Sequence, residues 1–388
     1  MAKSLKDTLL GTLVHGEETL ENIRVLRAVS GDKIVSKNVA DERIAPLHET
    51  ELKLAVSYTE DTGKNARVIR FASESGYLPP FEAGQYINIF TEIDGVRTSR
   101  PYSISSSPRQ RAYYEITVAR AAGGFVSDYL IDSVRQGDRF TANGPAGVFR
   151  YQPVFHSKKS LFLAGGSGIT PFMSMLREIT DASADRDVVL LYGCRSSETA
   201  LFHEELTELA QNNPGFRYSL VVSDKDAVWS GETGFIDRTL IERLVPDLSE
   251  RTAYICGPQI MNEFCQNELA AIGVPEKRIR REMSGSAKNI EKEPGWPSEL
   301  TGKETFKIKV GGRVVDALSG ESVLVALERA GIRVNVCCRS GECSLCRVKL
   351  ASGRVFLSKG IMLRKADEKY GYIHSCKAYP ISDLEIIL

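Results

Sequence analysis

The sequence predicts a multidomain fold: an antiparallel β-barrel, then a doubly wound α/β domain, then a small β-grasp-like domain. Three observations predict it. Short alternating strands with turn residues between them occupy the first part, apolar strands alternate with helices in the second, and a hairpin, a helix and a cysteine-rich loop make up the third. The predicted boundaries, with a linker before the last domain, are 51–153, 154–283, 284–303 and 304–388.

Composition is ordinary for a globular chain of 388 residues, with 42% apolar and 26% charged residues. Lys plus Arg and Asp plus Glu both count 50, so no net field favours nucleic acid or a membrane surface as partner. The N-terminus lacks an apolar signal core, and no stretch approaches the length of a transmembrane helix. Four of the eight cysteines (Cys194, Cys256, Cys265 and Cys337) lie mostly in apolar, regular segments, which predicts a reducing cytoplasm.

Residues 1–50 form an N-terminal extension of unknown role. Ser4 can cap a short helix with Leu5, Leu9 and Leu13 on one face. The segment is either a helix and hairpin packed on the next domain or a docking or dimerisation element.

The strands of the barrel follow from period-two alternation, in residues 52–56, 67–71, 85–90, 114–120 and 138–142. In the second domain, 160–164 is a continuous apolar run, as expected for a strand buried on both faces. Its predicted neighbours are strands 187–192, 218–222 and 252–256, and the predicted helices are 172–179, 200–211, 238–244 and 259–272.

The segment 284–303 is polar and broken by Gly and Pro, which predicts a linker long enough for the last domain to swing. After it come a hairpin through Gly311-Gly312, a helix over 322–330 and strands at 347–350 and 384–387.

The cysteine loop carries the most specific motif, C-x4-C-x2-C followed by one distant cysteine: Cys338, Cys343, Cys346 and Cys376. This is the plant-type [2Fe-2S] spacing, and Arg339 and Gly341 agree with it. The alternative is a zinc site with four thiolates. The sequence disfavours Rieske ligation, because that cluster needs two histidines and only His374 is near.

Four further motifs suit nucleotides. In Arg100-Pro101-Tyr102-Ser103 an arginine fork, an aromatic ring and a hydroxyl can hold a flavin, although a surface turn is the alternative. Gly123-Gly124 precede a helical segment and can expose N–H groups to a pyrophosphate. Gly165 to Pro171 follow the first buried strand, with Thr170 as predicted helix cap. Cys256-Gly257-Pro258 lie at the same predicted sheet edge, where Cys256 is either core or a thiol beside the nucleotide.

In this order the motifs resemble those of the ferredoxin-NADP reductase superfamily, arranged as flavin domain, NAD domain and plant-type ferredoxin domain over residues 52–388. Reductase components of the phthalate dioxygenase and phenylacetyl-CoA epoxidase type, and hybrid-cluster-protein reductases, have this arrangement. The resemblance implies that electrons pass from NAD(P)H to flavin, then to [2Fe-2S], then to a partner protein such as an oxygenase.

The resemblance also implies residue roles. Ser103, Cys256 and Glu282 would be catalytic, although Met283 replaces the aromatic residue that often follows the acid. Cofactor contacts would come from Arg100, Tyr102, Ser103, Gly123, Gly124, Val126, Ser127, Gly166, Thr170, Arg195, Asp224, Cys256 and Gly257.

The Gly123 loop favours FAD over FMN. Arg195 could take a 2′-phosphate, whereas Asp224 would repel one or bond ribose hydroxyls, and the balance favours NADH over NADPH. Glu342 and Glu368 could form a docking rim beside an exposed cluster.

Two other functions stay open: a redox-sensing or regulatory electron-transfer subunit, and a stand-alone NAD(P)H oxidase or flavin reductase, which would need no ferredoxin domain.

Overall fold

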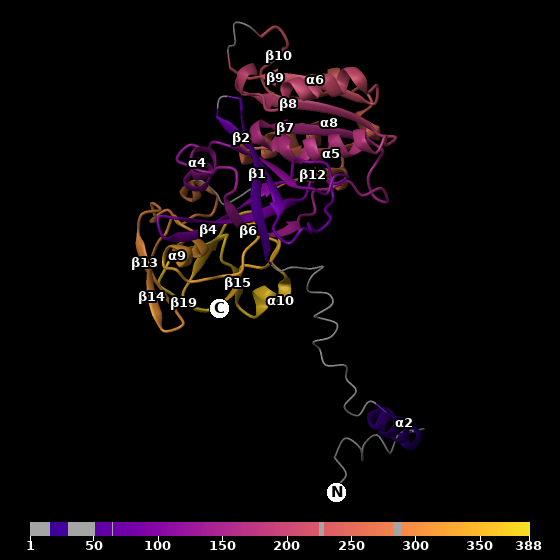
Figure 1. Ribbon diagram of the computed structural model, residues 1–388. Coiled ribbons are helices and arrows are strands. Elements are labelled where there is room, and N and C mark those ends of the chain that lie inside the picture. Colours follow the sequence, from indigo (N-terminus) through magenta and orange to yellow (C-terminus); the bar gives the residue numbers. More distant parts are fainter. Residues whose placement is uncertain (1–15, 30–50, 64, 225–228, 283–288) are drawn as a thin grey trace. The chain divides into compact units, whose positions relative to one another are not determined.

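The computed structural model describes residues 16–29, 51–63, 65–224, 229–282 and 289–388 (Figure 1). Residues up to Thr50 form a unit of their own. Its described part is helix α2 (Gly16–Val29), whose first turn carries Glu17 and Glu18, the charge that a helix N-terminus favours. The sequence did not predict this helix, and the predicted helix of Leu5 to Leu13 lies outside the described residues.

The barrel contains six antiparallel strands in the order β4-β3-β6-β1-β2-β5, which confirms the predicted architecture. They are β1 (Leu52–Thr62), β2 (Ala66–Ser73), β3 (Tyr86–Ile93), β4 (Val96–Ser103), β5 (Tyr114–Ala119) and β6 (Arg139–Ala146). A bridge between Ile104 and Ile116 joins the chain after β4 to β5, so the two edge strands of the sheet meet and close the barrel. Helix α4 (Phe125–Asp132) contributes Val126 and Leu130 to the barrel core.

The α/β domain has a parallel sheet in the order β10-β9-β8-β7-β11-β12. Its strands are β7 (Lys159–Gly165), β8 (Asp187–Cys194), β9 (Phe216–Val222), β10 (Glu232–Thr233), β11 (Thr252–Cys256) and β12 (Ile279–Arg281). Its helices are α5 (Thr170–Asp181), α6 (His203–Asn212), α7 (Arg238–Leu244) and α8 (Gln259–Ile272). In β7, Phe162 belongs to one core cluster and Leu161 and Leu163 to another, so the strand is buried on both faces as predicted. The strand order reverses between β7 and β11, and ligands bind at such a point.

The C-terminal domain has a five-stranded sheet, β14-β13-β19-β15-β17, and a two-stranded one, β16-β18. Its elements are β13 (Thr305–Val310), β14 (Arg313–Leu318), α9 (Val323–Arg329), β15 (Arg347–Ser352), β16 (Val355–Leu357), α10 (Lys365–Lys369), β17 (Tyr372–His374), β18 (Ala378–Pro380) and β19 (Leu384–Ile387). In the predicted linker, Trp296 packs edge-on against Phe356, and its ring lies 6.5 Å from that of Tyr379. This part of the linker therefore packs on the domain that follows it.

Strand β3 is buried on both faces. Ile87 and Ile89 point into the barrel core, while Tyr86, Asn88 and Phe90 point outward and contact the cysteine loop of the C-terminal domain. The period of two along a strand explains this division. The predicted swing of the C-terminal domain would have to break these contacts. No helix in the described part of the chain is long and apolar enough to cross a membrane.

Candidate functional site

Two loops meet at the carboxyl edge of the parallel sheet. The 3₁₀ turn η1 (Gly166–Ile169) follows β7, and the turn at Gly257 follows β11. A Cβ on Gly168 would lie 2.2 Å from the carbonyl oxygen of Cys256, and one on Gly257 would lie 3.2 Å from Cα of Gly165. The glycines are therefore needed for the loops to pack on each other, not only for a ligand to approach.

Thr170 is not a helix cap, so that prediction was wrong. Its hydroxyl donates to the carbonyl of Ser167 at 3.0 Å, and Ile169 is the residue before the helix. The chain passes directly from η1 into α5, which leaves no extended cap position for a threonine side chain to use.

A methyl group at Gly168 should damage both stability and nucleotide use. We expect Gly168→Ala to lose about 1–3 kcal/mol of unfolding free energy, because the Cys256 backbone must move, and to raise KM for the nicotinamide nucleotide. Denaturant unfolding and steady-state kinetics measure the two effects. Gly193→Ala is the matched control for stability, since its Cβ would have no neighbour nearer than 3.6 Å. Equal losses in both variants would contradict this explanation.

The three predicted catalytic residues come together from three separate strand ends. Ser103 ends β4, Cys256 ends β11 and Glu282 follows β12. Oε2 of Glu282 accepts from the Cys256 thiol at 3.1 Å and lies 3.5 Å from Oγ of Ser103. All three line a cavity of about 950 Å³, together with the predicted cofactor contacts Tyr102, Gly166, Thr170 and Gly257.

Burial sets the protonation of this group. Burial, with a smaller contribution from Glu342 of the cysteine loop, raises the pKa of Glu282 to about 7. Burial also raises the pKa of the Cys256 thiol well above its usual range. Cys256 is therefore a neutral donor, and Glu282 can hold or release a proton near neutral pH.

A second cavity of about 710 Å³ shares lining residues with the first, among them Ala119, Gly165 and Gly166, so the two cavities adjoin along the carboxyl edge of the sheet. Arg195 lines it as predicted. Asp224 is adjacent, because its N–H donates to the Arg195 carbonyl at 2.9 Å.

The apolar wall of this second cavity was not predicted. It includes Phe235, Ile260, Met261 and Phe264. The exposed fractions of Phe235 and Ile260 are 70% and 80%, unusual for such large side chains. The sequence signal that could have revealed this wall is the presence of large apolar residues outside the periodic pattern of the core.

The remaining predicted flavin contacts do not line either cavity. Gly124 precedes α4, Val126 is buried in the barrel core, and the Ser127 hydroxyl accepts from the Ala121 N–H at 3.3 Å. The Arg100 guanidinium donates to Thr98 and to the Ser99 carbonyl. Gly123 has a left-handed backbone with φ 66°, which turns the chain into α4. Their roles in flavin binding stay predictions.

The four predicted cluster cysteines form two pairs. No group of three or more His, Cys, Asp or Glu in the described ranges is arranged to hold a single metal ion. Instead, the Cys346 and Cys376 sulfurs are 3.2 Å apart, and the Cys338 sulfur is hydrogen-bonded by the Cys343 thiol and by the Ser340 and Cys343 N–H groups. Two pairs of thiolates suit the two irons of a [2Fe-2S] cluster.

The loop backbone is shaped for such a cluster. Arg339, Gly341 and Ser344 all have positive φ, and a Cβ on Gly341 would come within 3.0 Å of the Lys377 side chain. Hydrogen bonds lower the pKa of Cys338 to about 4, which favours the thiolate. The bond from the Cys343 thiol has the largest effect, and those from the loop N–H groups have smaller ones. His374 is hydrogen-bonded through Nδ1 to the Gly341 carbonyl and so anchors the loop.

A buried polar network joins the loop to the barrel. The Arg339 guanidinium is paired with Glu328 of α9 and donates to Thr98 at 3.2 Å, while Glu328 also accepts from Thr98 at 3.0 Å. The side-chain amides of Asn88 and Asn143 both donate to the Val336 carbonyl, at 3.3 and 2.8 Å.

Comparisons with known proteins assign each domain to a family. The oxidoreductase FAD-binding domain matches residues 53–151, the oxidoreductase NAD-binding domain 162–267, and the 2Fe-2S iron-sulfur cluster binding domain 306–380. The chain therefore carries domains for FAD, for a nicotinamide nucleotide and for a [2Fe-2S] cluster.

Several relatives align along most of the chain. NADH oxidoreductase HCR of Escherichia coli is 30% identical over 79% of this chain and 88% of its own length. The glycine betaine monooxygenase reductase subunit of Pseudomonas aeruginosa is 29% identical over 83% and 91%. The structure of phthalate dioxygenase reductase aligns with a TM-score of 0.65 and 26% identity over 87% and 97%. The predicted resemblance and three-domain fold are confirmed.

Proposed function

From the premise that this chain belongs to the ferredoxin-NADP reductase superfamily, as a reductase with flavin, NAD and [2Fe-2S] domains, we propose where its electrons enter and leave. Such an oxidoreductase passes electrons from NAD(P)H through FAD and the cluster to a partner protein. Entry is at Ser103, Cys256 and Glu282, and exit is through the cluster held by Cys338, Cys343, Cys346 and Cys376.

The meeting of Ser103, Cys256 and Glu282 on one cavity wall carries this proposal. FAD, when bound, accepts a hydride from the nucleotide and releases its two electrons singly. Tyr102 and Ser103 would hold the flavin at this wall, and Gly166 and Thr170 would border the nicotinamide, since all four line the cavity. The Cys256 thiol stays protonated, and the carboxyl of Glu282 is the group at this wall that can hold or release a proton near neutral pH.

NADH is the proposed donor. The backbone N–H of Asp224 donates to the carbonyl of Arg195, which lines the second cavity, so an acidic side chain follows the sheet edge where the adenosine would bind and would repel a 2′-phosphate there. A relative that is named for NADH supports this choice. Steady-state rates with each nucleotide test it, and a large preference for NADPH would contradict it.

The proposed acceptor is an oxygenase component. One relative is the reductase subunit of glycine betaine monooxygenase, and another is a subunit of the 1,2-phenylacetyl-CoA epoxidase of Escherichia coli.

Visible spectra of anaerobic protein, recorded before and after addition of NADH, test the internal electron route from NADH through the flavin to the cluster. We expect both the flavin bands and the iron–sulfur shoulder to bleach. Flavin bleaching alone, in protein that contains zinc, would refute the cluster assignment. Bleaching without catalytic reduction of ferricyanide would favour a regulatory subunit.

The pKa of Glu282 predicts the pH dependence of flavin reduction. Above pH 7 the carboxylate is charged and disfavours the arrival of a hydride beside it, so we expect the rate to be several-fold higher at pH 6 than at pH 8. Glu282→Gln has no such ionisation and should flatten the profile. Stopped-flow bleaching of the flavin band measures both, and an unchanged profile in the variant would assign the titration to another group.

A further inference from the structure

The cysteine loop has one solvent-facing side. Cys338, Cys346 and Cys376 are buried, whereas Cys343 is partly exposed. Leu345, between Cys343 and Cys346, exposes 49% of its surface. Electron transfer falls steeply with distance, so an acceptor protein must approach the cluster from this side.

A second segment runs along the same loop. The Met362 N–H donates to the Gly341 carbonyl at 3.0 Å, which fixes one end, and Asp367 of α10 pairs with Arg347 at 2.7 Å, which fixes the other. The residues between these two anchors therefore lie beside loop 341–347. Met362 exposes 64% of its surface, which adds a second apolar side chain to this face.

The charges on this face are unbalanced. Arg364 and Lys365 are exposed and form no ion pair with any residue in the described ranges. Asp367 is buried and its charge is met by Arg347, which leaves Glu368 as the exposed acid of the segment. Of the two residues of the predicted docking rim, Glu368 is exposed and Glu342 is partly buried.

We infer that the electron acceptor docks on the patch formed by Leu345, Met362, Arg364 and Lys365, and that its own docking face is acidic. This inference rests on the proposed function. The apolar pair provides the dry centre that such interfaces need, and the two free cations complement acidic side chains around it. Opposite charges also steer the encounter, in a way that depends on salt.

Two small haem proteins of opposite charge serve as probes, the acidic soluble domain of cytochrome b5 and the basic cytochrome c. We expect the full-length, fully oxidised protein to bind cytochrome b5 more tightly at low salt than at high salt. The variant Arg364→Glu with Lys365→Glu should bind it roughly tenfold more weakly, because two attractive pairs become repulsive. The same variant should reduce cytochrome c faster than wild type at low salt. Calorimetric titration gives the binding readout without turnover.

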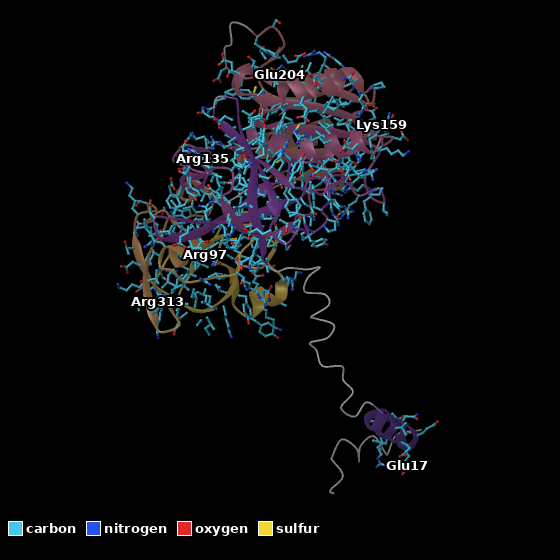
Figure 2. All side chains as sticks on the ribbon, in the orientation of Figure 1. Glu17, Arg97, Arg135, Lys159, Glu204 and Arg313 are labelled. Atoms are coloured by element: carbon cyan, nitrogen blue, oxygen red, sulfur yellow. The ribbon has the colours of Figure 1, made fainter. Side chains whose placement is uncertain are left out.

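The charge control is Lys307→Glu with Arg313→Glu, which makes the same change of net charge on the β13–β14 hairpin, where Lys307 is paired with Asp316 at 3.2 Å. This hairpin and β17 occupy opposite edges of the five-stranded sheet, Figure 1 shows the hairpin and α10 on opposite sides of the C-terminal domain, and Figure 2 labels Arg313 on the hairpin. Control and wild type should behave alike. Equal binding of cytochrome b5 by wild type and the Arg364/Lys365 variant would overturn the docking surface. Failure of NADH to bleach the wild-type cluster would instead overturn the proposed function.

Discussion

Cys338→Ser should lose the [2Fe-2S] absorbance and lower NADH-driven cytochrome c reduction by more than roughly a hundredfold, while NADH still bleaches the flavin band. Cys338 accepts the N–H groups of Ser340 and Cys343, so its sulfur is the one that the loop backbone surrounds. A loss limited to the step after the flavin would place this cysteine on the exit side of the electron route.

Cys337→Ser is the matched control, one residue away. The Cys337 sulfur accepts a hydrogen bond from the Tyr86 hydroxyl of the barrel and lies outside the two cysteine pairs. We expect it to keep the cluster spectrum and two iron atoms per chain, as [2Fe-2S] requires. If Cys337→Ser lost the cluster and Cys338→Ser kept it, the ligand assignment would be wrong.

Breaking the buried pair of Arg339 and Glu328 should have the next largest effect. Both side chains are nearly buried, with exposed fractions of 5% and 11%, and their ion pair joins the cysteine loop to α9 beside the barrel. Arg339→Met leaves Glu328 without its cation, which costs about 3–5 kcal/mol of unfolding free energy. We also expect slower bleaching of the cluster by NADH at an unchanged rate of flavin bleaching, because the loop loses its hydrogen bonds to Thr98 and Ser99.

A double-mutant cycle separates this pair from simple loss of packing. Arg339→Met combined with Glu328→Gln should recover much of the stability lost by Arg339→Met alone, since no unpaired charge remains. The exposed pair of Lys307 and Asp316 is the control, and breaking it should cost under about 1 kcal/mol. Additive losses at Arg339 and Glu328 would show that the two do not act together.

The sequence was sufficient for most of the fold because each element carries its own local signal. The bounds of α7, α8 and β11 were predicted to the residue, since periodic apolar positions end at clear breaks. The Arg339 network was not predicted, because it depends on residues about 240 positions apart that no local pattern connects.

The candidate site likewise contains residues that were predicted from the sequence and residues that were not. Ser103, Cys256 and Glu282 were selected by resemblance, and the structure brings them together from strand ends that only the sheet topology makes adjacent. The Thr170 cap failed because two helical turns join without a break. The apolar wall at Phe235 and Ile260 belongs to a ligand surface, which core periodicity cannot reveal.

The paired amides on the Val336 carbonyl limit how freely this reductase can be recombined with others. Asn88 and Asn143 belong to β3 and β6 of the barrel, yet they fix a residue two positions before the first cluster cysteine. A chimaera that takes residues 304–388 from a relative therefore inherits a loop shaped for a different barrel. Functional domain exchange in this protein requires the outward face of β3 and Asn143 of β6 to be transplanted together with the ferredoxin domain.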